Sequence, residues 1–178
     1  MIVETISFSP GRTIPNNSVL PVLAYRQVFD RQDDLAAAFA ARFQGNDWQG
    51  IWRNGVFDHH HYHSQAHEVL GIAGGEAVLM LGGPEGKAFT VAANDCLVLP
   101  AGTGHCRLKA SSDFLVIGGY PPGQAADMQS GPADAAMLAA IRTCPLPERG
   151  PLDDAVESLR RHWCDAAARA RSENPLER

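Results

Sequence analysis

The sequence predicts an all-β domain, a sandwich or barrel of short strands, with a helix before it and helices after it. The chain has 178 residues, which is enough for one domain with a real core and short for two. Between residues 51 and 122, runs of β-forming residues alternate with glycine and proline turns at intervals of about ten residues. Helical spacing of apolar residues returns on both sides of this section. We therefore expect one structural domain in three parts: an extension of strand and helix over 1–50, a barrel core over 51–122 and a helical extension over 123–178.

The first part contains one expected strand and one expected helix. Residues 19–29 are rich in β-formers, and Pro21 indicates either an edge strand or a strand that begins after the proline. Apolar residues then recur at helical spacing as far as Gly45. We expect Asp30 or Asp33 to cap this helix.

The barrel strands are short and regularly spaced. Gly74 and Gly75, Asn94 and Asp95, and Gly102 separate them as turn residues. This spacing favours a sandwich or barrel over a parallel sheet with helices. The expected strands cover residues 67–73, 76–82, 89–91, 96–100, 106–108 and 113–120.

Two helices are expected in the last part. Gly131 and Pro132 start the first, which ends before Pro145. The second starts near Pro151, with two aspartates, Asp153 and Asp154, in its first turn. We expect its apolar stripe to pack against the barrel or against a second subunit. That stripe consists of Leu152, Val156, Leu159 and Trp163.

Composition excludes several classes of partner. The net charge is −5 and basic residues form no cluster, so we expect no nucleic-acid partner. No apolar run approaches the roughly 18 residues of a membrane helix, and the first residues lack the pattern of a secretory signal. Four cysteines occur without paired spacing, which predicts free thiols in a cytoplasmic protein. They are Cys96, Cys106, Cys144 and Cys164.

Histidines are concentrated between residues 58 and 68. Five of the seven in the chain fall here, namely His59, His60, His61, His63 and His67. A purification tag is excluded because the run is internal, whereas a solvated polar loop is an alternative. If the segment is a strand, residues two apart share a face, so His61 and His63 can converge on one ion. His60 and Tyr62 then point to the opposite face.

Two further candidate ligands lie outside this histidine pair. Glu68 follows His63 after a gap long enough for a bend that returns it to the same cavity. His105 follows the turn-forming sequence Pro100–Gly104 and starts the next strand. Three imidazoles and one carboxylate suit Fe, Mn, Ni, Cu or Zn, and do not favour Ca or Mg. An octahedral ion would keep two positions open, whereas zinc could be four-coordinate and structural.

The spacing of these residues resembles the two motifs of the cupin superfamily. The first motif, G(X)5HXH(X)3–4E(X)6G, is matched by Gly55, His61, His63, Glu68 and Gly75. The second, G(X)5PXG(X)2H(X)3N, is matched at Pro100, Gly102 and His105. Asn94 and Lys109 replace its first glycine and its final asparagine, and asparagine tolerates the turn geometry of glycine.

A narrower resemblance covers roughly residues 14–145, to the YjlB-like single-domain cupins. It rests on the phrases HYHSQAHEVLGIAGGEA, LGGPEG, VLPAGTGH and DFLVIGGYPPGQ. The resemblance implies a double-stranded β-helix, the cupin jelly-roll barrel. It also implies one divalent transition metal inside, held by His61, His63, Glu68 and His105. It implies no particular reaction.

Three functions are compatible with such a site. The first is a metal-dependent enzyme, of dioxygenase or isomerase type, acting on a small polar substrate. The second is a non-catalytic module that binds a small molecule, and the third is a structural metal site. Arg53 is either a substrate contact at the barrel mouth or an ordinary surface arginine. We also expect a homodimer, because a small open barrel has strand edges to cover.

Several neighbouring residues have expected structural roles. Alternation turns Cys106 away from the metal, and Tyr62 packs on the opposite face from the ligands. Cys96 is either a buried inert thiol or, if it faces inward, a further ligand. Gln65 and His67 are candidates for orienting Glu68.

Overall fold

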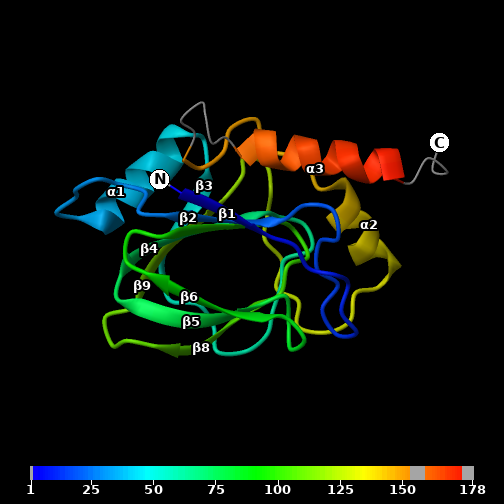
Figure 1. Cartoon of the computed structure of the whole chain (residues 1–178), viewed down its shortest axis with the longest axis horizontal. Helices are drawn as coiled ribbons and strands as arrows, with labels where there is room; N and C mark the ends of the chain where they lie inside the picture. Colours follow the sequence, from blue (N-terminus) through cyan, green and yellow to red (C-terminus); the bar gives the residue numbers. More distant parts are fainter. Residues whose placement is uncertain (1, 153–158, 174–178) are drawn as a thin grey trace.

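Two antiparallel sheets face each other and enclose a barrel in the computed structural model, which describes residues 2–152 and 159–173 (Figure 1). This confirms the all-β jelly-roll barrel. The six-stranded sheet has the order β1 (Ile2–Ile6), β2 (Val22–Arg26), β7 (Cys96–Leu99), β4 (Glu68–Gly74), β9 (Leu115–Tyr120) and β3 (Gln49–Asn54). The three-stranded sheet has the order β6 (Lys87–Ala92), β5 (Glu76–Leu81) and β8 (His105–Ala110).

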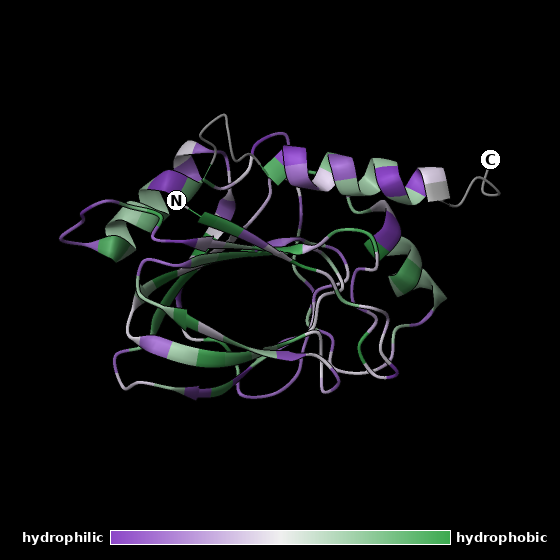
Figure 2. Ribbon diagram, viewed as in Figure 1, coloured by the Kyte–Doolittle hydropathy of each residue, from purple (hydrophilic) through white to green (hydrophobic). Residues whose placement is uncertain are grey.

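The two sheets differ in how their outer faces are covered, and their sequences reflect this. Every residue of β7 is buried, and so are the first five of β4, because the larger sheet is covered on both faces. Strands buried on both faces read as continuous apolar runs. In β6 of the smaller sheet, buried and exposed residues alternate, since its outer face meets solvent. Figure 2 shows this alternation as changes of colour along the lower strands.

The barrel interior holds one apolar core. Leu70 of β4 and Leu79 of β5 belong to it, so it joins the two sheets. Their neighbours on the outer side of the larger sheet, such as Val69, belong to a second core.

Helices cover this second core from outside. The helix α1 (Leu35–Gly45) contributes Phe39 and Phe43, both fully buried. The helix α3 (Leu159–Glu173) crosses the same side of the barrel (Figure 1) and contributes Trp163. The indole nitrogen of Trp163 donates a hydrogen bond of 2.9 Å to the Pro21 carbonyl.

The expected stripe of the second C-terminal helix therefore packs on its own barrel. Leu152, Leu159 and Trp163 are buried in the outer core. Val156 and the two expected first-turn aspartates, Asp153 and Asp154, lie outside the described residues.

The first two helices of the chain start at other residues than expected. The cap of α1 is Asp34, whose carboxylate accepts from the Ala37 amide, so the expectation of Asp30 or Asp33 was wrong. The helix α2 (Ala135–Thr143) begins after Asp134, whose carboxylate accepts from the Met137 amide. Gly131 and Pro132 precede that helix and do not start it. In both cases the aspartate nearest to the helical run supplies the cap.

The sequence analysis did not predict two strands of the larger sheet. These are β1 and β3, which form its two edges. The strand β2 begins directly after Pro21, and it lies between β1 and β7, so it is not an edge strand. Pro21 has no N–H to donate, but it lies outside the strand, so the hydrogen bonds between β2 and its neighbours are complete without it.

Turn residues that permit a positive φ close the strands as expected. Asn94 has a φ of 77° and Gly102 has a φ of 90°. The Asn94 side chain also accepts from the Phe29 amide and donates to the Phe29 carbonyl. Asparagine at this position therefore makes the turn and also anchors the loop before α1, which glycine could not do.

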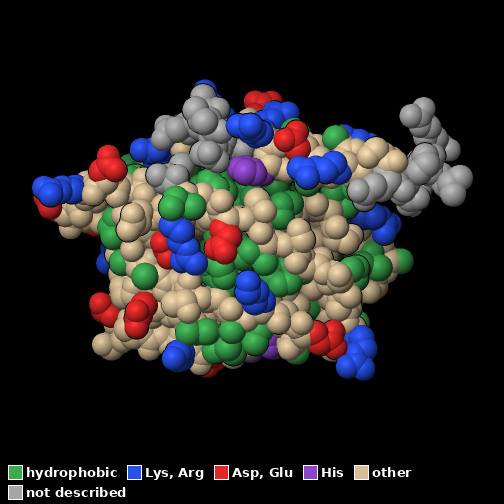
Figure 3. All heavy atoms as spheres, in the orientation of Figure 1, with side chains coloured by type: hydrophobic (Ala, Val, Ile, Leu, Met, Phe, Trp, Pro, Cys, Tyr) green, Lys and Arg blue, Asp and Glu red, His purple; other side chains and the backbone are tan. Residues whose placement is uncertain are grey.

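The described surface and thiols agree with the composition. Basic and acidic side chains are interspersed over the face seen in Figure 3. All four cysteines are free. Of the helices in the described ranges, none has the length and apolar character that crossing a bilayer requires.

The variant Trp163→Ala tests whether α3 is part of the fold. It removes a fully buried indole, so we expect the free energy of unfolding to fall by about 3–5 kcal/mol. Denaturant unfolding measures this, with the exposed Arg160→Ala on the same helix as the control, expected to change stability by less than about 0.5 kcal/mol. Equal stability of Trp163→Ala and the control would contradict the packing of α3.

Candidate metal centre

The histidine-rich segment crosses the barrel mouth as a loop between β3 and β4. The sequence was compatible with a strand or a polar loop, and only two isolated bridges form, His61 with His105 and Tyr62 with Gln129. Side chains of successive residues still point to opposite faces in this short stretch, as expected. His61 and His63 turn toward the cavity, while Tyr62 is buried and its hydroxyl donates to the Gly131 carbonyl.

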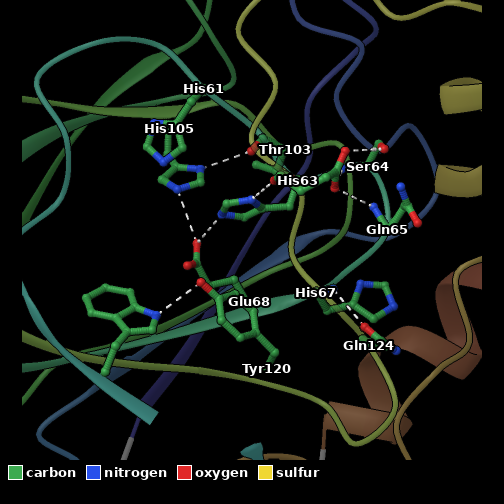
Figure 4. A network of polar contacts seen from close by, with 12 residues as sticks. His61, His63, Ser64, Gln65, His67, Glu68, Thr103, His105, Tyr120 and Gln124 are labelled. Atoms are coloured by element: carbon green, nitrogen blue, oxygen red, sulfur yellow. Dashed lines mark hydrogen bonds and ion pairs between the residues drawn. The ribbon is translucent and has the colours of Figure 1, made fainter. Parts of the chain in front are cut away.

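The four residues expected as ligands come together at this point (Figure 4). The candidate ligand nitrogens of His61, His63 and His105 lie within 4.8 Å of one another. Glu68 is the first residue of β4, and its Oε2 lies 3.4 Å from His63 Nε2 and 3.2 Å from His105 Nε2. His105 is the first residue of β8. All four side chains are buried.

Backbone carbonyls fix the orientation of each imidazole. His61 Nδ1 lies 3.1 Å from the His59 carbonyl, and His105 Nδ1 lies 3.1 Å from the Thr103 carbonyl. His63 Nδ1 contacts the Asp127 carbonyl. A carbonyl only accepts, so each Nδ1 carries the proton. The Nε2 lone pairs are then free to bind a cation, which is the usual arrangement of metal-binding histidines.

The donor set fits a divalent transition metal. Glu68 Oε2 is buried and receives no hydrogen bond within the described chain. It faces Nε2 atoms whose tautomer leaves lone pairs rather than protons toward it. A buried carboxylate oxygen among acceptors is costly unless a cation lies between them. Imidazole nitrogens with one carboxylate suit Fe, Mn, Ni, Cu or Zn.

Protonation states at the cluster favour cation binding. Burial, helped by the neighbouring charge of His105, lowers the pKa of His61 to about 3, so His61 is neutral near pH 7. Burial works against the charged form of Glu68, but the adjacent imidazoles of His105 and His63 outweigh it and hold the pKa of Glu68 well below its usual range. Burial likewise lowers the pKa of His63, but Glu68 outweighs it and the net shift is upward. A bound cation therefore competes with a proton at His63.

A cavity of about 250 Å³ opens in front of the cluster. Tyr120 lies on its wall, and its hydroxyl donates to the Glu68 carboxylate while accepting a 3.1 Å hydrogen bond from Trp52 Nε1. Burial and the charge of Glu68 raise the pKa of Tyr120 to about 12. This chain of donors holds the Glu68 carboxylate in one orientation, and Figure 4 shows Tyr120 beside Glu68.

Asp127 fixes the loop that carries His63. Its carboxylate accepts from the Ser64 amide at 2.7 Å, the Ser64 hydroxyl at 2.6 Å, the Gln65 amide at 3.0 Å and Gln129 Nε2 at 3.0 Å. Its carbonyl orients the His63 ring. One residue between β9 and α2 therefore positions both the backbone and the imidazole of a candidate ligand.

Three residues that the sequence analysis weighed do not join the cluster. Arg53 is exposed and lines the cavity, so it lies at the mouth, and a substrate contact there stays a prediction. Cys106 turns away as expected, with its Sγ 3.9 Å from His60 Nε2. Cys96 is buried in the outer core, which excludes it as a ligand.

The two residues expected to orient Glu68 do not do so. The Gln65 side chain is exposed. His67 is buried against Trp163 at a ring distance of 4.7 Å, and its Nδ1 accepts from the Ala101 amide. His67 therefore links α3 to the turn before His105. It directly precedes β4, and neighbouring residues of an extended chain point to opposite faces, so its ring turns away from the Glu68 side chain.

Sequence reasoning missed Asp127, Tyr120 and Trp52. Asp127 lies in a loop more than 60 residues from its partner Ser64, and no local spacing marks such a pair. Tyr120 ends β9, and Trp52 lies opposite Gly118, two residues before Tyr120, in the pairing of β3 with β9. Alternation from the buried Val116 along β9 could have indicated that Tyr120 faces the interior.

Comparison with known proteins gives one clear relative. The chain is 35% identical over 162 residues to the uncharacterized protein YjlB of Bacillus subtilis (strain 168). This match covers 90% of the chain and 96% of that protein. No protein-family model matches the chain.

Solved structures with similar folds are more distant. The epimerase RmlC of Legionella pneumophila is 13% identical with a TM-score of 0.40, over 83% of this chain and 86% of that one. The acireductone dioxygenase of Bacillus anthracis, with cadmium in its active centre, is 14% identical with a TM-score of 0.37, over 62% and 80%. A Bacillus subtilis oxalate decarboxylase variant is 18% identical with a TM-score of 0.36, over 66% of this chain and 29% of that one. Identities and scores this low give no information about the reaction of this chain.

The variant His105→Ala tests the ligand set. Loss of one of four ligands should weaken binding of Co²⁺ or Mn²⁺ by more than the roughly 10- to 100-fold that loss of an outer partner costs. Equilibrium metal titration measures the dissociation constant, with His60→Ala as the matched control because His60 contacts Cys106 instead. Unchanged affinity in His105→Ala would exclude His105 as a ligand.

The variant Asp127→Ala tests the positioning of His63. It leaves all four candidate ligands in place but removes the acceptors that hold Ser64 and Gln65. We expect metal affinity to fall roughly 10- to 100-fold, with a smaller loss in Asp127→Asn, which keeps one acceptor oxygen. The exposed Asp58→Ala is the control. If Asp127→Ala binds metal like Asp58→Ala, the loop contacts do not position His63.

Proposed function

This chain belongs to the family of YjlB, a group of single-domain cupins, and on that premise we propose that it is a metal-dependent enzyme acting on a small molecule. The proposed ligands of one divalent transition metal are His61, His63, Glu68 and His105. The proposed reaction is of dioxygenase or isomerase type.

The observation that carries the proposal is the buried Glu68 oxygen facing imidazole nitrogens at the end of an open cavity. Each imidazole is oriented by a carbonyl on its far side. Such preorganised ligands bind a metal without rearranging.

Access to the cluster favours catalysis or ligand binding over a closed structural site. The four proposed ligands all line the cavity, so a small molecule can reach them. A structural metal site is typically closed, with four protein ligands and no solvent position. A bound metal with open positions supplies Lewis-acid chemistry or oxygen activation.

The residues around the cluster have defined roles in this proposal. Tyr120 holds the Glu68 carboxylate and keeps its own proton at neutral pH, because its pKa is raised to about 12. Trp52 and Leu70 form an apolar wall that limits water beside the cluster. Arg53 at the mouth is proposed to meet an anionic group of the substrate.

Water proton relaxation of the Mn²⁺-loaded protein tests whether the metal has a coordination position open to solvent. We expect faster proton relaxation than for a fully coordinated ion, because at least one exchangeable water completes the coordination. Elemental analysis of the purified protein accompanies this measurement, and iron or manganese near one equivalent per chain agrees with the proposal. Tightly held zinc without a solvent ligand would contradict it.

A further inference from the structure

We propose that the cavity takes a small monoanionic carboxylic acid that carries an apolar group about the size of a ring. This inference rests on the proposed function, since it names the substrate class of the same site. The cavity has apolar surfaces beside the proposed metal ligands, and these select the ligand.

The mouth of the cavity has an apolar rim. Phe57 is 48% exposed and Met128 is 52% exposed, and both line the cavity. They come from segments far apart in the chain, the loop after β3 and the loop after β9. Large apolar side chains brought together at a cavity mouth mark a binding surface more than chance exposure does.

The Phe57 ring is held in place rather than free in solvent. It stacks on His59 with centroids 5.1 Å apart, and it meets His61 edge-on at 5.3 Å. The rim therefore directly adjoins one of the proposed ligands. A molecule bound at the cluster would therefore have this ring beside it.

The inner wall is also apolar. Val56 and Leu70 are buried and line the cavity beside Trp52. A fully polar molecule would lose water against these side chains without gaining hydrogen bonds. A molecule with one apolar group gains roughly 25 cal/mol for each Å² that it buries here.

The cluster itself favours an anion. Its histidines are oriented as neutral ligands and Glu68 contributes one negative charge, so a divalent ion leaves one net positive charge. Arg53 adds a further positive charge at the mouth. Arg53 is exposed, so solvent screens its charge, and in the largely apolar cavity the net charge of the cluster is neutralised by one carboxylate on the ligand.

The volume of the cavity limits the size of the ligand. About 250 Å³ lies below the roughly 300–1,000 Å³ of sites for drug-sized ligands. The space therefore suits a carboxylate with one ring or one branched chain, and not a nucleotide or a large sugar.

Glycolate and mandelate provide a matched pair of probes, because both are 2-hydroxy acids and mandelate adds only a phenyl group. The full chain is loaded with Co²⁺, and each acid is titrated by visible absorption and by calorimetry. We expect mandelate to bind at least about tenfold more tightly than glycolate. Methyl mandelate, which lacks the negative charge, should bind at least about tenfold more weakly than mandelate.

Variants at the apolar rim test whether it causes the preference for mandelate over glycolate. Phe57→Ala should reduce mandelate affinity roughly three- to tenfold and leave glycolate affinity unchanged. Met128→Ala provides an independent test on the other segment. Leu108→Ala is the control, since Leu108 is 51% exposed on β8 and does not line the cavity.

The outcomes separate this inference from the proposed function. If Co²⁺ binds at one equivalent but mandelate binds no better than glycolate, the ligand class is wrong and the metal site stands. Equal effects of Phe57→Ala and Leu108→Ala would also overturn the inference. If Co²⁺ does not bind at the cluster, the proposed function fails, and the inference fails with it.

Discussion

The buried carboxylate of Glu68 makes the strongest demand on the surrounding structure. A charge removed from water needs an opposite charge or donors around it, and here the imidazoles of His63 and His105 face it, with His61 close to both. Carbonyls behind each ring hold the protons on the far nitrogens, so the near side offers lone pairs. One side of the carboxylate thus suits a cation, and the Tyr120 hydroxyl on the cavity wall holds the carboxylate in place. The proposed metal would lie between this carboxylate and the imidazoles.

The fold supplies each part of this cluster from a rigid element or from a loop held by polar contacts. Glu68 begins β4 in the middle of the larger sheet, which is buried on both faces because α1 and α3 cover it. His105 begins β8 after a turn that Gly102 permits with its φ of 90°. His61 and His63 lie on a loop, and Asp127 provides the fixed backbone that a strand would otherwise give.

The features that were predicted correctly depend on residues close together in the sequence. Turn residues separated the barrel strands, and Asn94 made a positive-φ turn as expected. The four clustered residues were found from motif spacing and alternation. Contacts between distant segments explain what was missed. The pairing of β3 with β9 brings Trp52 to Tyr120, and the loop after β9 brings Asp127 to Ser64. The cap at Asp34 was missed because Asp30 and Asp33 lie close to it in the sequence, and the cap at Asp134 was missed because Gly131 and Pro132 also fit a helix start.

Anomalous diffraction from crystals of the Co²⁺-loaded protein tests the central claim most directly, because it locates the ion independently of any assay. The account predicts one strong peak at about 2.0–2.2 Å from the Nε2 atoms of His61, His63 and His105 and from a Glu68 oxygen. A further coordination position should face the cavity. A peak at other residues, or no ordered peak at this cluster in protein that retains one equivalent of Co²⁺, would contradict the account.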